Sequence, residues 1–305
     1  DNALCLDMKI PQGTVSLTVL PINHVYCLTM DIIKGISIGM IICINDSIMR
    51  FQRNLKLFQP EIVLLVPMII ESLAGKLKEI DPSVPKEQAA AAIFGGKLKT
   101  ICSGGAYLDP DCIRLFKEFG ITILQGYGMT ECSPVISTNL EWENKIGSVG
   151  KLLPNCEAKT VDYELWVRGS SVMQGYYKMP EETAAALEDL GYVDEDRFVF
   201  LTGRRKNLII LANGENVSPE ELENELGRND LVKEILVREH EKVIEAEIFP
   251  DPEYMEKHTI TEPEPLLQEL VDRLNGSMPV YKRIARLIVR EVPFERTAAG
   301  KIKRF

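Results

Sequence analysis

The chain has 305 residues, of which 45% are hydrophobic and 26% charged, a composition typical of a folded globular protein of about two domains. Its formal net charge of −10 argues against binding nucleic acid as its main task, because phosphate backbones require clustered Lys and Arg side chains. The longest apolar stretch, residues 32–44, contains Lys34 and is too short to span a bilayer, so we expect neither a transmembrane helix nor a signal peptide.

From residue 15 to about residue 125 the sequence alternates apolar, strand-like runs with amphipathic helical ones. Strands are predicted at VSLTVLP, ISIGMIICI, EIVLLVP, LKTICSG and ITILQGYG (residues 15–21, 36–44, 61–67, 98–104 and 121–128). A helix is predicted over residues 68–80, where apolar side chains recur every three or four positions, and another over 109–120, ending at Gly120. This alternation predicts an α/β fold with a mostly parallel sheet.

After about residue 145 the pattern changes to short β runs, ELWVRG (164–169) and RFVFLTG (197–203). A smaller unit follows, with helices predicted over 219–227 and 264–275 between strands. In the first of these helices, Ser218 is placed to cap the N-terminus, with Pro219 as the first helical residue and Glu221 completing a capping box. We expect a domain boundary near residues 203–207.

The seven cysteines show no CxxC or zinc-type spacing, and several lie in apolar runs where a free thiol behaves as a small hydrophobic group. We therefore expect a reducing, cytoplasmic location. The chain begins at Asp1 rather than Met, so we also expect it to be part of a longer protein.

One stretch, LQGYGMTECSP (residues 124–134), combines a predicted strand with a glycine-rich turn of the kind that meets phosphates. A dinucleotide fold would need a third glycine where this chain has Glu131. Thr130 and Glu131 suit a different task, in which the hydroxyl bonds a phosphate oxygen and the carboxylate holds Mg²⁺. A plain turn with a solvated glutamate remains the alternative for this stretch alone.

Five patterns occur in a fixed order: SGGA (103–106), GYGMTE (126–131), Asp189 before LGYVDED, LTGRRKN (201–207) and TAAGKIKR (297–304). With these motifs the chain resembles the adenylate-forming superfamily of acyl-CoA synthetases, luciferases and the adenylation domains of peptide synthetases. LPINHVY (20–26), SGGAYL, MQGYY (173–177) and the run from GRRKN to PEELE are most similar to the long-chain fatty-acid–CoA ligase branch.

This resemblance implies the fold and the reaction. Residues 1–205 would be the second half of the large adenylation domain, the C-terminal part of a mostly parallel-sheet domain with a β-rich subdomain. Residues 206–305 would be a small, mobile α+β lid domain. A carboxylic acid and ATP would give acyl-adenylate and pyrophosphate, and the acyl group would pass to coenzyme A. The implied cofactors are ATP or AMP, Mg²⁺ and coenzyme A, and a peripheral membrane contact stays open.

The matching motifs also assign a nucleotide site. Tyr127, between Gly126 and Gly128, would stack on adenine, while Thr130 contacts the phosphates and Glu131 binds Mg²⁺. The adenine and acyl pocket would be lined by Gly104, Gly105 and Ala106. The carboxylate of Asp189 would accept hydrogen bonds from both ribose hydroxyls, and Arg204 would support the ribose or phosphate side.

Lys301 matches the family's catalytic lysine, whose ammonium would bridge the acid's oxygen and the α-phosphate. In isolation a solvated basic tail would be the favoured reading of TAAGKIKR, and the other four motifs reverse that preference. His24 would lie near the acid and pyrophosphate, with a packed core histidine as the alternative. Lys206 matches the hinge about which the lid rotates, and Gly214 would then line the tunnel for the pantetheine arm.

Two departures limit these expectations. The family's Ser/Thr/Gly-rich phosphate loop ending in Pro-Lys is absent, so the N-terminal half of the large domain is missing, and the chain alone is expected to bind ATP weakly or be inactive. About ten residues are expected but missing between Glu188 and Asp189, with a similar shortfall near Asp162. Two alternative functions remain: a ligase that loads a carrier protein, and a nucleotide-binding regulatory module without catalysis.

Overall fold

The computed structural model describes residues 5–6, 8–161, 164–178, 189–204, 207, 209–210, 216–241, 243–296 and 302–304, with only the backbone described for residues 189–190, 203–204, 210 and 216. The chain divides into two compact units. The first comprises residues 1–187 and 191–201, and the second comprises residues 188–190 and 202–305.

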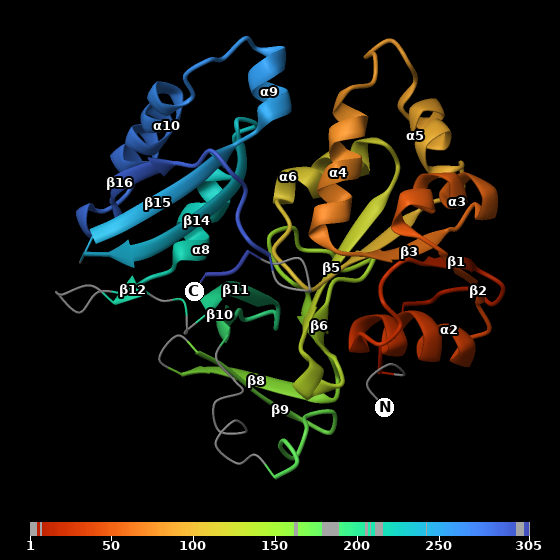
Figure 1. Ribbon diagram of the computed structural model, residues 1–305. Coiled ribbons are helices and arrows are strands. Elements are labelled where there is room, and N and C mark those ends of the chain that lie inside the picture. Colours follow the sequence, from red (N-terminus) through yellow and green to blue (C-terminus); the bar gives the residue numbers. More distant parts are fainter. Residues whose placement is uncertain are drawn as a thin grey trace. The chain divides into compact units, whose positions relative to one another are not determined.

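A seven-stranded sheet organises the first unit, in the order β2-β1-β3-β4-β5-β6-β7 (Figure 1). Its strands are β1 (Val15–Thr18), β2 (Ile41–Ile44), β3 (Ile62–Leu65), β4 (Thr100–Ser103), β5 (Thr122–Gly128), β6 (Val135–Thr138) and β7 (Lys151–Leu152). The strands from β2 to β5 pair in parallel, whereas β6 and β7 add antiparallel pairs. This confirms the predicted α/β fold with a mostly parallel sheet.

Four helices cover one face of this sheet: α3 (Phe51–Phe58), α4 (Pro67–Lys78), α5 (Lys86–Phe94) and α6 (Pro110–Glu118). The sheet contributes alternate residues such as Leu17, Val63 and Ile101 to their common core, as expected from the two-residue period of a strand. Pro67 and Pro110 occupy the first turns of α4 and α6, where proline costs no hydrogen bond. The core therefore holds the parallel strands and their carboxyl ends in place.

The opposite face carries the π-helix η1 (Cys27–Ile33) and α2 (Lys34–Ser37). The prediction of a strand over residues 36–44 was wrong for its first five residues, and the helix over residues 27–37 was not predicted. Lys34 is buried and donates to the carbonyl oxygen of Leu6 at 2.6 Å, which fixes the helical segment. Gly39, with φ +74°, then turns the chain into β2.

A second, four-stranded sheet has the order β11-β10-β9-β8. It is formed by β8 (Cys156–Val161), β9 (Glu164–Gly169), β10 (Asp189–Val193) and β11 (Val199–Arg204). Leu165, Val167 and Val199 from this sheet share a buried cluster with Tyr127 and Cys132, which belong to β5 and to the short 3-10 helix η3 (Thr130–Cys132). The small sheet is thus packed directly against the motif that follows β5.

The second unit contains the three-stranded sheet β14-β15-β16 and a small β12–β13 pair. Its elements are β12 (Ile209–Ile210), β13 (Asn216–Val217), α8 (Pro219–Leu226), β14 (Val232–His240), β15 (Val243–Pro250), α9 (Pro252–Lys257), α10 (Glu264–Ser277) and β16 (Ile284–Val289). Leu222 of α8 and Leu267 of α10 are fully buried against Ala246 and Ile248 of β15. Helices α8 and α10 agree with the two predicted helices to within two residues at each end.

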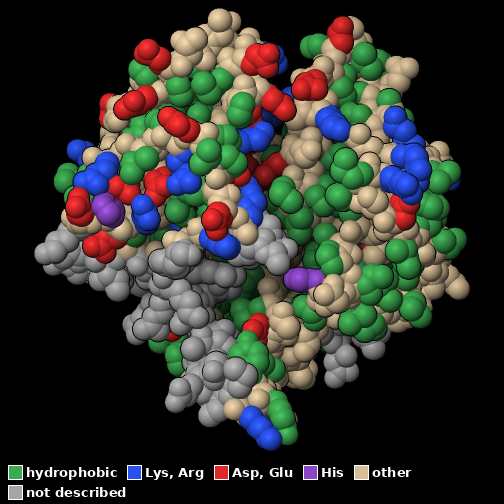
Figure 2. All heavy atoms as spheres, in the orientation of Figure 1, with side chains coloured by type: hydrophobic (Ala, Val, Ile, Leu, Met, Phe, Trp, Pro, Cys, Tyr) green, Lys and Arg blue, Asp and Glu red, His purple; other side chains and the backbone are tan. Residues whose placement is uncertain are grey.

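Charged side chains of both signs are interspersed over the surface of the second unit, which contains the three-stranded sheet β14-β15-β16 (Figure 2). Glu245 and Glu247 of β15 are buried and ion-paired: Glu247 lies 2.5 Å from Arg238 and 2.7 Å from Arg290, and Glu245 lies 3.2 Å from Arg286. Pairing with guanidinium groups compensates the cost of burying these carboxylates.

The N-terminus of α8 corrects one detail of the sequence analysis. Ser218 is the N-cap residue and Pro219 begins the helix, as predicted, but the capping box does not form. The Ser218 hydroxyl instead donates to Glu220 Oε2 at 2.9 Å, and Glu221 pairs with Lys282 at 2.7 Å. The opposite charge of Lys282 draws Glu221 away from the helix end. None of the helices in the described part of the chain is long and apolar enough to cross a membrane.

Candidate active site

The predicted site residues of the first unit gather at one edge of the seven-stranded sheet. Strands β1, β3, β4 and β5 run parallel, so their carboxyl ends lie together. His24 follows β1, Gly104 to Ala106 follow β4, and Gly126 to Gly128 end β5. The order of strands reverses at β1, which has β2 on one side and β3 on the other. Open α/β sheets bind their ligands at the carboxyl edge, where the strand order reverses.

The turn after β5 has a backbone that only glycine permits. A Cβ atom on Gly128 would lie 2.0 Å from the carbonyl oxygen of Pro134. The same carbonyl accepts a hydrogen bond from the Met129 N–H at 2.9 Å, so the two segments are held together. This close approach leads the chain directly into η3 and leaves Thr130 exposed at its start.

Tyr127 has a structural role that its motif does not reveal. Its side chain is 8% exposed and packs in the apolar cluster with Cys132, Leu165 and Val199. The ring therefore links the turn to the four-stranded sheet, and little of its surface is left open. Its predicted stacking on adenine stays a prediction.

Glu131 is held by a residue that was not predicted to take part in the site. The hydroxyl of Tyr176 donates to Glu131 Oε1, and the Met173 N–H donates to the carbonyl oxygen of Glu131 at 2.7 Å. The hydrogen bond to the carboxylate raises the pKa of Tyr176 above its ordinary 10.0, so the phenol stays a donor at neutral pH. The sequence analysis used MQGYY only as a motif of the resemblance and gave Tyr176 no role in the site.

Thr130 and Glu131 of η3 could bind a magnesium ion only together with further ligands. Among the described residues, no group of three or more His, Cys, Asp or Glu side chains could enclose a metal ion. Glu131 and Thr130 supply one carboxylate and one hydroxyl, both hard oxygen donors. Mg²⁺ is commonly held by one or two carboxylates together with substrate phosphates rather than by a complete protein cage. The donor set therefore suits a metal ion that arrives with a nucleotide.

Tyr26 shapes the part of the edge formed by β4. Its hydroxyl donates to the carbonyl oxygen of Cys102 at 3.2 Å, and its ring lies 3.2 Å from where a Cβ atom on Gly104 would stand. Burial raises the pKa of Tyr26 well above 10.0 and keeps the phenol neutral. Gly105 has φ +84°, which an L-residue rarely adopts, and both Gly105 and Ala106 are exposed. An aromatic wall and an uncovered backbone thus adjoin each other after β4.

His24 is exposed, so the alternative of a packed core histidine is wrong. Its Nδ1 atom accepts a hydrogen bond from the Tyr26 N–H at 3.2 Å. The neutral ring therefore carries its proton on Nε2, which can donate to an anionic ligand.

The other predicted residues are described less fully. Asp189 begins β10 and Arg204 ends β11, but only their backbones are described. Lys206, Gly214 and Lys301 lie outside the described residues, as do Glu188 and Asp162, where missing residues were expected. Their roles stay predictions.

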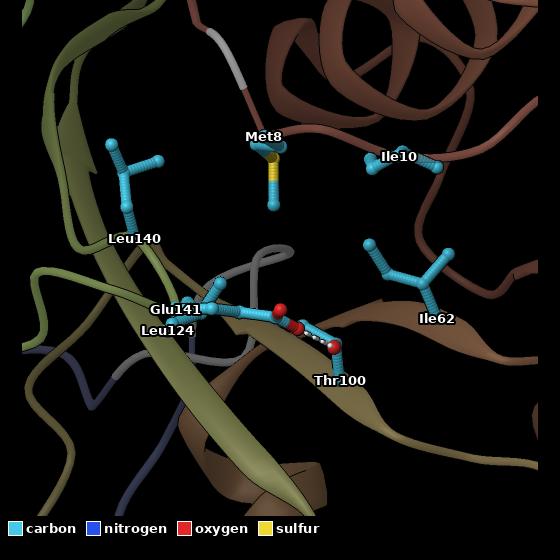
Figure 3. A pocket seen from close by; sticks show the side chains of 7 residues that line it. All are labelled: Met8, Ile10, Ile62, Thr100, Leu124, Leu140 and Glu141. Carbon is cyan, nitrogen blue, oxygen red and sulfur yellow. Dashed lines mark hydrogen bonds between the residues drawn. The ribbon is translucent and has the colours of Figure 1, made fainter.

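A small cavity lies away from this edge (Figure 3). It is lined by Met8, Ile10, Ile62, Thr100, Leu124, Leu140 and Glu141. Ile62 and Thr100 are the first residues of β3 and β4, at the opposite ends of the strands from the candidate site. Its volume of about 30 Å³ has room for only one or two water molecules, and the Thr100 hydroxyl already donates to Glu141 at 2.9 Å.

Comparison with known proteins identifies a family for both units. Residues 2–177 match the family described as AMP-binding enzyme, and residues 206–305 match the one described as AMP-binding enzyme C-terminal domain. A long-chain-fatty-acid–CoA ligase of Mycobacterium bovis is 37% identical over 174 residues, 54% of this chain and 29% of that protein. A 2-succinylbenzoate–CoA ligase of Bacillus pumilus is 30% identical over 250 residues, 75% of this chain and 48% of that protein.

A solved structure of o-succinylbenzoate CoA synthetase from Bacillus subtilis, in complex with its acyl-adenylate intermediate, has a TM-score of 0.80 and 25% identity. It covers 99% of this chain and 63% of that one. The same enzyme in complex with ATP and a magnesium ion has a TM-score of 0.78 at the same identity and coverage. The chain therefore spans less than two thirds of the length of each of these relatives.

Proposed function

The chain belongs to the AMP-binding enzyme family, and from this premise we propose that the protein of which it is a part activates a carboxylic acid with ATP and transfers the acyl group to coenzyme A. The observation that carries this proposal is the turn from β5 into η3. That turn presents an exposed hydroxyl at Thr130 and a fixed carboxylate at Glu131, at the carboxyl edge of a parallel sheet. A carboxylate suits a magnesium ion that is bound together with substrate phosphates, and a hydroxyl can donate to a phosphate oxygen.

The reaction needs no protein nucleophile. In the first step a carboxylate oxygen of the acid attacks the α-phosphorus of ATP, the bond to pyrophosphate breaks, and acyl-adenylate forms. In the second step the thiol of coenzyme A loses its proton and attacks the acyl carbon, and AMP leaves. A carboxylic acid is already ionised at neutral pH, so the protein must align it and stabilise charge on the phosphate oxygens.

The family resemblance divides this work among residues of the chain. Thr130 would bond a phosphate oxygen, and Glu131 would hold Mg²⁺, which supplies positive charge to the phosphates. The exposed His24, with its proton on Nε2, would donate to the leaving pyrophosphate or to the acid. The ammonium of Lys301 would bridge the acid and the α-phosphate.

The remaining assignments concern nucleotide and thiol binding. Tyr127, flanked by Gly126 and Gly128, would contact adenine, and Gly104, Gly105 and Ala106 would border the adenine and acyl groups. Asp189 and Arg204 would hold the ribose side. In the second step Lys206 would act as the hinge and Gly214 would face the pantetheine arm.

A long-chain fatty acid is the proposed substrate. The support is the 37% identity to a long-chain-fatty-acid–CoA ligase, whereas the relative from Bacillus pumilus is named for 2-succinylbenzoate. We also propose a cytoplasmic location, because all seven cysteines are free thiols and fit a reducing environment.

ATP–pyrophosphate exchange on the full-length protein tests the proposal. Acids of increasing chain length should support exchange, with the best rates for long chains, and adding coenzyme A should yield the thioester. Pyrophosphate exchange without formation of the coenzyme A thioester, together with acyl transfer to an added phosphopantetheine carrier protein, would show that the acceptor is the carrier protein and not coenzyme A. Nucleotide binding without exchange for any acid would refute the enzymatic proposal and favour a regulatory module.

A further inference from the structure

Two hydrogen bonds from one short segment converge on Glu131. The Met173 N–H donates to the main-chain carbonyl of Glu131 at 2.7 Å, and the Tyr176 hydroxyl donates to its side-chain Oε1. Residues 173–176 therefore fix both the backbone and the carboxylate of this residue. Glu131 lies in η3, a 3-10 helix of three residues, and is only partly buried, so burial alone does not fix its side chain.

A glutamate side chain has three rotatable bonds, and a single carboxylate that must meet a metal ion loses this freedom on binding. A donor that already holds one oxygen restricts the carboxylate beforehand and leaves a second oxygen able to hold a cation. Partners of this kind, which contact a ligand residue rather than the metal, commonly affect metal affinity 10- to 100-fold.

We propose that Tyr176 is a positioning residue, whose hydroxyl holds Glu131 in the orientation required to bind magnesium with ATP. The inference rests on the proposed function of Glu131 and adds a residue that acts through it. It also assigns a role to the MQGYY motif, in which Met173 fixes the backbone and Tyr176 fixes the carboxylate.

The next residue provides a matched control. Tyr177 is 85% exposed, and Lys178 Nζ lies 5.2 Å from the centroid of its ring. Tyr177→Phe therefore removes one hydroxyl group from the motif, as Tyr176→Phe does, but leaves the hydrogen bonds to Glu131 in place.

The experiment measures the binding of ATP to the full-length protein by calorimetry, with Mg²⁺ and with EDTA. Tyr176→Phe should weaken binding of Mg²⁺–ATP about 10- to 100-fold and leave metal-free ATP within about threefold. Tyr177→Phe should match the wild type in both conditions. Equal weakening of both forms of ATP by Tyr176→Phe would show a general structural role and overturn the inference, as would no change in either.

A double-mutant cycle separates this inference from the proposed function. In a Glu131→Gln background, Tyr176→Phe should have little further effect on Mg²⁺–ATP binding, because its role passes through the carboxylate. Full additivity of the two substitutions would overturn the inference. The proposed function is tested separately by ATP–pyrophosphate exchange, in which the wild-type protein is assayed with different carboxylic acid substrates. That assay can fail while the role of Tyr176 in binding Mg²⁺–ATP is confirmed, and the reverse also holds.

Discussion

At the scale of single residues, the buried groups near β1 show how the chain supports its carboxyl edge. Asp31 of η1 is 3% exposed and accepts a hydrogen bond from the Ser16 hydroxyl of β1 at 3.0 Å. Its charge also raises the pKa of neighbouring Cys27 and Tyr26, after the larger effect of their burial. The side chain of Asp31 therefore links η1 to β1, the strand that leads to His24.

Asp31 predicts a pH dependence of stability. Burial raises its pKa above the ordinary 3.8, so the folded state keeps the proton to a higher pH than the unfolded state. Its contribution to the free energy of unfolding consequently falls as the pH rises from about 3.8 through the folded pKa. Cys27 titrates only at about 11 and Cys102 at about 12, outside this window.

The test compares Asp31→Asn with the wild type by denaturant unfolding at several pH values from 4 to 8. Asparagine can still accept the Ser16 hydrogen bond but carries no charge, so the stability of the variant relative to the wild type should increase with pH. A difference that does not change with pH would contradict this account of Asp31.

Tyr127→Leu separates stacking from packing. Leucine keeps much of the apolar volume in the cluster with Leu165 and Val199 but removes the aromatic ring. If the ring also contacts adenine, the apparent KM for ATP should rise more than kcat changes, because stacking acts in ground and transition states alike. Steady-state exchange kinetics on the full-length protein would measure this, with melting temperature as the fold control. An unchanged KM would remove Tyr127 from the nucleotide site.

Lys301→Ala tests the predicted catalytic lysine. One preorganised charge at the α-phosphate is worth roughly 10²- to 10³-fold in rate, so acyl-adenylate formation should fall by that factor. Thioester formation from preformed acyl-adenylate should persist, because the lysine acts in the first step alone. Equal loss of both half-reactions would indicate a structural role instead.

At the scale of elements, a glycine within α4 and the glycine that ends β5 serve opposite purposes. Gly75 is exposed within helix α4, and nothing lies within 4 Å of the position that a Cβ would take. Gly128 leaves no such space, because a Cβ would lie 2.0 Å from Pro134 O. Gly75 therefore lowers the stability of helix α4 without a steric need, whereas Gly128 is required by the close approach of the turn to Pro134.

Alanine at these two positions should therefore have opposite effects. Gly75→Ala should stabilise the chain by roughly 0.5–1 kcal/mol through helix propensity, without altering ATP binding. Gly128→Ala should destabilise it and weaken ATP binding, because the turn must move. Melting curves and nucleotide titrations would measure both effects, and a Gly128→Ala variant with unchanged properties would show that this turn tolerates displacement.

The same scale shows what the sequence could predict. Runs such as EIVLLVP identify buried parallel strands because they are apolar without interruption, and β3 lies where that run predicts. ISIGMIICI is also continuously apolar, yet its first part is helical, since an apolar run alone does not distinguish a buried helix from a strand. Tyr176 was missed because its partner, Glu131, lies 45 residues away in the sequence.

At the scale of the whole molecule, the described chain exposes an apolar surface over η1, α2, β2 and the short helix η2 (Ile48–Arg50). Hydrophobic side chains gather there in Figure 2. They include Leu28, Ile33, Ile36, Ile41, Ile44, Ile48 and Met49, which are 40% to 89% exposed. Exposed apolar side chains gathered in one region favour association, so function should be measured on the full-length protein.

The central claim is that ATP is attacked at its α-phosphorus by a carboxylate, which isotope transfer can test directly. The full-length protein would be given a fatty acid labelled with ¹⁸O in its carboxylate, together with ATP, Mg²⁺ and coenzyme A. Because the attacking oxygen stays with phosphorus when the thiol displaces AMP, mass spectrometry should find one ¹⁸O in AMP and none in pyrophosphate. Formation of ADP with ¹⁸O in inorganic phosphate would place the attack at the γ-phosphate and contradict the account.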